Sequence, residues 1–159
     1  MSRSSTVGAQ ALIPNAALKR LEFLIGEWRT TGLHPEVPGR SLTGRTSFAW
    51  HEGGAFLIMR SEIDEPLFPS GVAIFGSDDV AGTVAMVYFD ERGVSRIFRV
   101  TAGDGTVTWR RDDPQFSQSV TITVADGGDR LIAKGRMAKG DGVWVDDLSQ
   151  VYVRAEASE

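Results

Sequence analysis

The chain has 159 residues, enough for one domain that buries roughly two-thirds of the surface its unfolded chain exposes. Its 17 lysines and arginines against 21 aspartates and glutamates give a formal net charge of -4, and neither sign is clustered, which excludes the concentrated positive charge of nucleic-acid-binding proteins. Cysteine is absent, so disulfides, thiolate catalysis and thiolate metal sites are excluded as well.

The two ends of the chain lack structural signals. Residues 1–13 contain no apolar run long enough for a signal peptide or a membrane span, and residues 156–159 are small and acidic. We expect flexible tails at both ends of one domain over residues 14–155, and a cytoplasmic protein without a membrane partner.

One helix is predicted directly after Pro14. Asn15 can cap its first turn, and Gly26 stops it. Its apolar residues recur at helical spacing, so this face is expected to cover another part of the fold: Leu18, Leu21, Leu24 and Ile25.

After Gly26 the sequence alternates between short strand patterns and strong turn signals. Gly next to Asp, Asn or Pro supplies the backbone geometry that hairpins require. Nine such turns separate ten predicted strands: Pro38-Gly39, Gly53-Gly54, Pro66 to Gly71, Ser77 to Gly82, Asp90 to Gly93, Gly103 to Gly105, Asp112 to Pro114, Asp126 to Asp129 and Gly140 to Gly142.

Short sequential strands favour antiparallel neighbours. Thr83 to Asp90, Val94 to Thr101 and Ser117 to Val124 alternate polar and apolar residues or are rich in β-branched and aromatic types. A sandwich is one arrangement, but a closed meander removes exposed strand edges, and the N-terminal helix can plug one end. The sequence therefore predicts an all-β fold: a ten-stranded antiparallel up-and-down β-barrel with room inside for a ligand.

Two segments at opposite ends of the chain resemble the calycin superfamily. Gly26-Glu27-Trp28 opens the first strand, and Tyr152-Val153-Arg154 ends the last. In calycins a Gly-x-Trp closes the barrel floor and an Arg of the last strand packs across that Trp. The resemblance therefore implies a structural pair of Trp28 and Arg154 in a lipocalin-like barrel.

A longer part of the chain, from about Leu21 to Arg154, resembles bacterial lipocalin-like proteins of unknown function that are distantly similar to nitrobindins. The matching segments are Gly26 to Trp28, His34-Pro35, Gly53 to Leu57, Tyr88 to Gly93 and Phe116 to Gln118.

Nitrobindins bind haem through one axial His near the end of the chain. This chain has only His34 and His51, neither in its last third, so haem binding would need a different axial residue. We predict no cofactor and keep a haem-binding nitrobindin-like protein as an alternative.

Strand alternation places His34 on the same face as Trp28, near one mouth of the barrel. An imidazole there could hydrogen bond to a ligand or act as a general base, since it titrates near neutrality. The alternative is an ordinary His at the mouth or on the surface.

Arg60 and Glu62 share one face of the third strand, and the register of that strand is open. If they point inward, the pair could orient a polar ligand, and Glu62 could act as an acid or base. The opposite face, with Leu57 and Met59, is at least as apolar, and if it is the inner one the two charges are on the surface.

The next strands carry the best candidates for the interior: Tyr88, Arg96, Trp109 and Arg111. A buried Arg needs an anion or a carboxylate, because an unpaired charge in a cavity is costly. Tyr88 and Arg96 could hold the carboxylate of a ligand, with Trp109 against its apolar part. The alternative is an internal network in which Glu62 and Asp90 satisfy the arginines.

Adjacent carboxylates occur at Asp112-Asp113 and Asp146-Asp147. Neighbouring residues on a strand point to opposite faces, so neither pair chelates a metal by itself, and no metal is predicted. Asp90 to Gly93 is interpreted as a hairpin turn.

Three functions remain compatible with this pattern, because no motif for a nucleophile, a phosphate loop or a metal site is present. The first is binding of a small amphipathic or anionic aromatic molecule in the barrel. The second is an enzyme doing acid-base chemistry on such a compound with His34, Tyr88 or Glu62. The third is a filled barrel that serves as an interaction module, and pairing into a homodimer is compatible with each.

Overall fold

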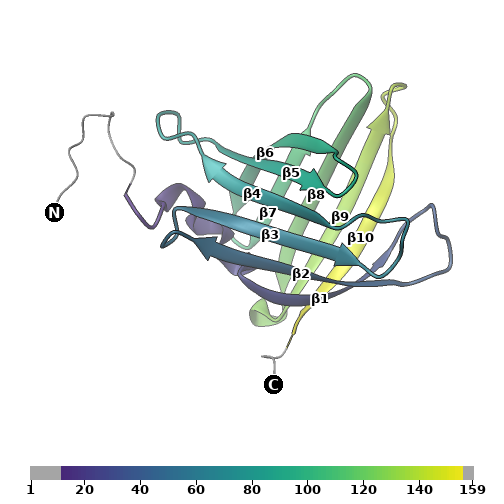
Figure 1. Ribbon diagram of the computed structural model, residues 1–159, viewed down its shortest axis with the longest axis horizontal. Helices are drawn as coiled ribbons and strands as arrows, with labels where there is room; N and C mark the ends of the chain where they lie inside the picture. The colour runs from purple at the N-terminus through teal and green to yellow at the C-terminus, as the bar shows by residue number, and fades with distance from the viewer. Residues whose placement is uncertain (1–11, 156–159) are drawn as a thin grey trace.

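Figure 1 shows the computed structural model, which describes residues 12–155. Within that range the ten predicted strands are all present, and each pairs antiparallel with the next. The expected tails lie outside the described residues except for Leu12 and Ile13, whose side chains are exposed. The strands are β1 (Gly26–Leu33), β2 (Leu42–His51), β3 (Phe56–Ile63), β4 (Gly71–Ser77), β5 (Val84–Asp90), β6 (Ser95–Gly103), β7 (Thr106–Arg111), β8 (Phe116–Ala125), β9 (Arg130–Lys139) and β10 (Trp144–Arg154).

The sheet closes on itself between its first and last strands. β1 pairs with β10 from Trp28 opposite Arg154 to Leu33 opposite Ser149. Closure leaves no outer strand edge, which is the physical reason why a meander of short hairpins forms a barrel. The predicted ten-stranded antiparallel barrel is thus confirmed.

The N-terminal helix closes one end of the barrel (Figure 1), as predicted, but it is a 3-10 helix, η1 (Ala16–Leu24). Its buried residues Leu18, Leu21 and Leu24 are three positions apart, which matches the three residues per turn of this helix type. Asn15 caps it by accepting a hydrogen bond from the backbone of Ala17. Neither η1 nor the short η2 (Asp126–Gly128) of the described range is long and apolar enough to cross a bilayer.

The Trp28 and Arg154 side chains meet at this closed end. The Arg154 guanidinium lies 4.3 Å from the centre of the Trp28 ring and donates hydrogen bonds to the backbone oxygens of Ile25 and Gly128. Trp28 itself donates to the oxygen of Leu24 in η1. These contacts connect the helix, the first strand and the last strand.

The interior of the barrel is filled at the closed end and open at the other. Large apolar side chains fill the closed half, among them Trp28, Phe48, Leu57, Phe75, Ile122 and Leu131. Further along the strands the inward positions become small. Because small side chains cannot fill a ten-stranded barrel, this half keeps a cavity, and the small residues that line it are Ser61, Ala73, Ala133 and Gly135.

Candidate functional site

The open half of the barrel contains a cavity of about 450 Å³. That volume lies within the range of pockets that hold small organic molecules. Its wall is mostly apolar and aromatic, and the charged groups gather near the mouth. The apolar wall includes Met59, Met86, Phe98, Trp109, Phe116, Val120 and Met137.

Arg96 enters the cavity from the mouth end of β6. Its guanidinium donates a hydrogen bond of 3.0 Å to Oε1 of Gln118 and lies 4.9 Å from the centre of the Phe116 ring. Burial, with the neighbouring charges of Arg111 and Arg92, lowers the pKa of Arg96. Because its hydrogen-bond partner is a neutral amide, the positive charge is not paired, and the position favours an anion.

Arg111 stands next to this group at the end of β7, opposite Gln118 in the β7–β8 ladder. Its Nε is buried and has no hydrogen-bond partner. The closest carboxylate, Asp113, is 3.8 Å from Nη2, too far for a hydrogen bond. Of the two arginines expected in the interior, Arg96 lines the cavity and Arg111 does not.

Tyr88 lines the cavity with its hydroxyl already engaged. It donates a hydrogen bond of 2.8 Å to Asp90, and Arg92 donates to the same carboxylate oxygen. Gly71 leaves room for the Tyr88 ring, because a Cβ there would lie 2.7 Å from a ring carbon.

The pKa values of this trio follow from its contacts. Hydrogen bonds from Arg92 hold the pKa of Asp90 well below its usual range. Burial, followed by the hydrogen bond to Asp90, raises the pKa of Tyr88 to about 12. Tyr88 is therefore protonated at neutral pH and does not act as a base. The alternative network is not formed, because Asp90 pairs with Arg92 and not with Arg96.

His34 lies at the mouth, as the strand alternation indicates, and both its ring nitrogens are engaged. Nδ1 accepts a hydrogen bond from the backbone N–H of Glu36, and Nε2 lies 2.9 Å from Oδ1 of Asp147. Since a backbone N–H can only donate, the neutral ring carries its hydrogen on Nε2. The edge of the ring also meets Phe68 of the β3–β4 loop. His34 therefore connects three elements at the mouth and has no free nitrogen for a general base.

Sequence reasoning missed Asp147 and Gln118. Asp146 and Asp147 do point apart, since Asp146 is exposed and Asp147 reaches His34. A bulge in β10 between Asp146 and Ser149 sets this geometry, and it packs closely on Gly135. In the sequence, the one signal for this bulge was Gly135, because a glycine within a strand often marks a bulge or a close approach of another backbone segment.

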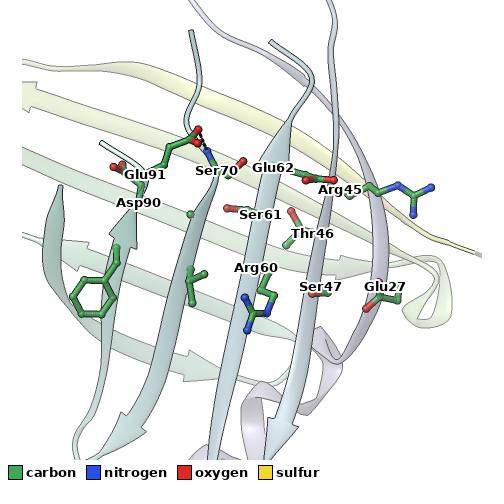
Figure 2. Close-up of a pocket in the computed structure, with 13 residues that line it drawn as sticks. Glu27, Arg45, Thr46, Ser47, Arg60, Ser61, Glu62, Ser70, Asp90 and Glu91 are labelled. Atoms are coloured by element: carbon green, nitrogen blue, oxygen red, sulfur yellow. Dashed lines mark hydrogen bonds between the residues drawn. The ribbon is translucent and has the colours of Figure 1, made fainter. Parts of the chain in front are cut away.

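The structure places Arg60 and Glu62 outside the barrel, and their assignment to a ligand site in the lumen is wrong. On β3 the inward positions are Leu57, Met59 and Ser61. Figure 2 shows Arg60 in a row with Ser47 and Glu27 across β3, β2 and β1, over a shallow depression of the outer face. Glu62 is likewise removed as a candidate acid or base for chemistry in the cavity.

Neither histidine of the chain is placed to act as an axial haem ligand in the cavity. Both nitrogens of His34 are already bonded, and His51 stacks on Phe56 on the outer face of the barrel, away from the cavity. Among residues 12–155, no cluster of three or more His, Asp or Glu side chains could hold a metal ion.

No family model and no curated protein matches the sequence. Solved structures with a similar fold include the following three. Rv2717c from M. tuberculosis has a TM-score of 0.59 and 18% identity over 89% of this chain and 98% of its own. A protein of unknown function from the DUF3598 family of Nostoc punctiforme has a TM-score of 0.59 and 13% identity over 85% of this chain, which spans 49% of that protein. The S-type phycobiliprotein lyase CPES from Guillardia theta has a TM-score of 0.58 and 12% identity over 88% of this chain and 93% of its own.

At 12–18% identity these likenesses concern the fold alone, and they support the barrel fold of this chain. They do not show a specific similarity to nitrobindins.

Proposed function

We propose that the protein binds a small amphipathic molecule, an aromatic compound with an acidic group, in the cavity of the barrel. Arg96 holds the acidic group, and the aromatic wall around Trp109 and Phe98 packs against the rest. The observation that carries the proposal is the state of Arg96 in a mostly apolar cavity: its guanidinium lines the cavity, and its hydrogen-bond partner is the neutral amide of Gln118.

The energetics favour an anion at this position. Arg96 has only a neutral hydrogen-bond partner, and a carboxylate that accepts from its guanidinium forms a charge-assisted hydrogen bond, worth about 1.5–3 kcal/mol. The carboxylates nearby do not serve this purpose, because Asp90 is bound to Arg92 and Asp147 to His34. Burial of the aromatic part adds about 25 cal/mol per Å² of apolar surface.

Two further considerations support binding over the other hypotheses. A filled interaction barrel would lack a cavity of this size. An acid-base enzyme would need a free base, whereas His34 and Tyr88 are each tied to a carboxylate. The likeness to a phycobiliprotein lyase supports small-molecule handling by barrels of this shape.

The test is calorimetric titration of the protein with 2-naphthoate. The uncharged alcohol 2-naphthalenemethanol, which has the same ring system, is the control ligand. We expect one naphthoate per chain and binding of the alcohol at least about tenfold weaker, because only the acid pairs with Arg96. Arg96→Gln should abolish this preference. Arg60→Gln is the matched control, since Arg60 lies on the outer face, and it should leave both affinities unchanged. Equal affinities for acid and alcohol, or an unchanged preference in Arg96→Gln, would contradict the proposal.

A further inference from the structure

The sheet is closed, but its β6–β7 ladder is short on the side of the mouth. Among the described residues the ladder runs from Gly103 opposite Thr106 to Arg99 opposite Arg110, and it has no further pair. β6 nevertheless begins at Ser95, so its first residues pair with β5 alone. A groove of about 1190 Å³ lies along this stretch, between β6 and β7.

The residues that line this groove indicate that the barrel wall is open there. Ile97 and Arg99 of β6 are exposed on the outer face, whereas Arg96 and Phe98 lie on the inner face. All four line the groove, and Arg96 and Phe98 line the cavity as well. A continuous sheet separates inward from outward side chains, so a space lined by both kinds lies at a gap in the wall. The groove and the cavity therefore adjoin at Arg96 and Phe98.

Arg111 stands on the other side of this gap. It lies on the same face of β7 as Trp109, but it lines the groove and not the cavity. Its side chain is accessible, with 23% of its surface exposed. The charge of Arg111, after burial, is a cause of the lowered pKa of Arg96. The two guanidinium groups are thus close enough to repel each other across the gap.

Positive charge exceeds negative charge along the groove. Of the described residues, four arginines and one acid line it: Arg96, Arg99, Arg110, Arg111 and Asp112. Asp112 is bonded to Arg110. Asp113 approaches Arg111 only to 3.8 Å, and its carboxylate accepts hydrogen bonds from the backbone of the following turn. An anion that reaches both Arg96 and Arg111 offsets their repulsion, which neither of these acids does.

We infer that the acidic end of the bound molecule is a doubly charged group, such as the phosphate of a monoester, that lies in the gap between β6 and β7 and contacts both Arg96 and Arg111. The inference rests on the proposed function and narrows it: the aromatic part occupies the cavity, and the acidic end reaches the groove. Arg96 serves any acid in this position, whereas Arg111 selects for the second charge.

The experiment is calorimetric titration of the full chain with 2-naphthyl phosphate and 2-naphthyl sulfate. The two esters share the ring system and a tetrahedral acidic end, but at about pH 8 the phosphate carries nearly two negative charges and the sulfate only one. We expect the phosphate to bind about tenfold more tightly, the value of one additional charge-assisted hydrogen bond.

Three variants assign this preference to its residue. Arg111→Gln should reduce the preference for the phosphate toward one and change the affinity for the sulfate much less. Arg111→Lys keeps the positive charge and should retain a preference for the phosphate. Arg60→Gln is the matched control, because it removes one exposed arginine from a different part of the outer face, and it should leave the preference unchanged.

The outcomes separate this inference from the proposed function. Equal affinities for the two esters, a preference that survives in Arg111→Gln, or an equal loss in Arg60→Gln would overturn the inference while the proposed function stands. The same holds if 2-naphthoate binds and neither ester does. If 2-naphthoate and both esters fail to bind, the proposed function itself is contradicted and the inference falls with it.

Discussion

Tyr88 donates its hydroxyl hydrogen to Asp90, two positions further along the same face of β5, and Arg92 from the following turn holds the same carboxylate. The Asp90 carboxylate is fully buried by these partners. At the rim of the cavity, Tyr88, Asp90 and Arg92 of one hairpin thus hydrogen bond to one another. Arg96, on the neighbouring strand, is left without an acid partner.

Asp90 should make the protein sensitive to acid. Its folded-state pKa lies well below the unfolded value near 4, so its contribution to stability is present above about pH 4 and is lost as the pH falls below that value. Asp90→Asn should lower the free energy of unfolding at pH 7 and flatten its decline between about pH 4 and pH 2, measured by urea denaturation. Asp112→Asn is the control, because Asp112 is mostly exposed. Parallel declines in Asp90→Asn and the parent protein would contradict this assignment.

The two tyrosines of the chain should resist ionisation together. Tyr88 and Tyr152 both have a pKa raised to about 12, chiefly by burial, against an ordinary value near 10. Unfolded tyrosines ionise first, so their contribution to stability is complete below about pH 10 and is lost as the pH rises toward 12. Absorbance of the native protein at 295 nm should show almost no phenolate at pH 10.5, whereas the urea-unfolded chain should show most of it. If half of the phenolate absorbance of the native protein appears near pH 10, one of the two tyrosines does not have the raised pKa. The same titration of Tyr88→Phe then identifies that tyrosine.

Arg154 and Arg110 each stack on a tryptophan, and Arg154 should contribute much more to the free energy of unfolding. Arg154 covers the buried Trp28 and has two backbone hydrogen bonds, whereas Arg110 lies 4.8 Å over Trp144 with half its side chain exposed. Arg154→Met should cost about 2–4 kcal/mol in denaturant unfolding, from the lost cation–π contact and the unpaired carbonyls. Arg110→Met should cost less than about 1 kcal/mol, as expected at exposed sites. Equal losses would mean that the closed end is not held by Arg154.

The contact between His34 and Asp147 should restrain the loop between β1 and β2. Asp147→Asn removes a charge-assisted hydrogen bond that holds this loop to β10. Amide hydrogen exchange over residues 34–38 should become about 5- to 30-fold faster, which corresponds to about 1–2 kcal/mol of local stability. Asp146→Asn is a close control, since the neighbouring carboxylate is exposed and points outward. Unchanged exchange in Asp147→Asn, or the same increase in both variants, would argue against this role.

The fold could be predicted because its signals are local and repeated. Each hairpin turn is encoded by a few residues, and the Gly-x-Trp and terminal Arg motifs indicated how the ends meet. The helix type was the exception: Leu18, Leu21 and Leu24 are compatible with both an α-helix and a 3-10 helix, and only packing against the barrel decides between them.

The site was harder to predict because it depends on register and on partners far apart in the sequence. On β3 both faces are apolar enough to point inward, and the neighbours Phe48 and Phe75 determine that Leu57 does so. Arg96 of β6 bonds to Gln118 of β8, which is 22 residues further along the chain. This contact depends on how the two strands lie at the mouth, which no local pattern in the sequence shows. Asp147 depends on a bulge, which shifts side chains without a strong local signal.

The most direct test of the central claim uses the methionines, because three of the four in the chain line the cavity: Met59, Met86 and Met137. We would record the NMR spectrum of protein labelled with ¹³C at the methionine methyl groups during titration with 2-naphthoate, with single Met→Leu variants to assign the signals. Aromatic rings shift the resonances of nearby methyl groups, so all three signals should move with one common dissociation constant, and Arg96→Gln should weaken that constant. Saturable binding of naphthoate that leaves these three methyl signals unmoved would place the ligand outside the barrel and contradict the account.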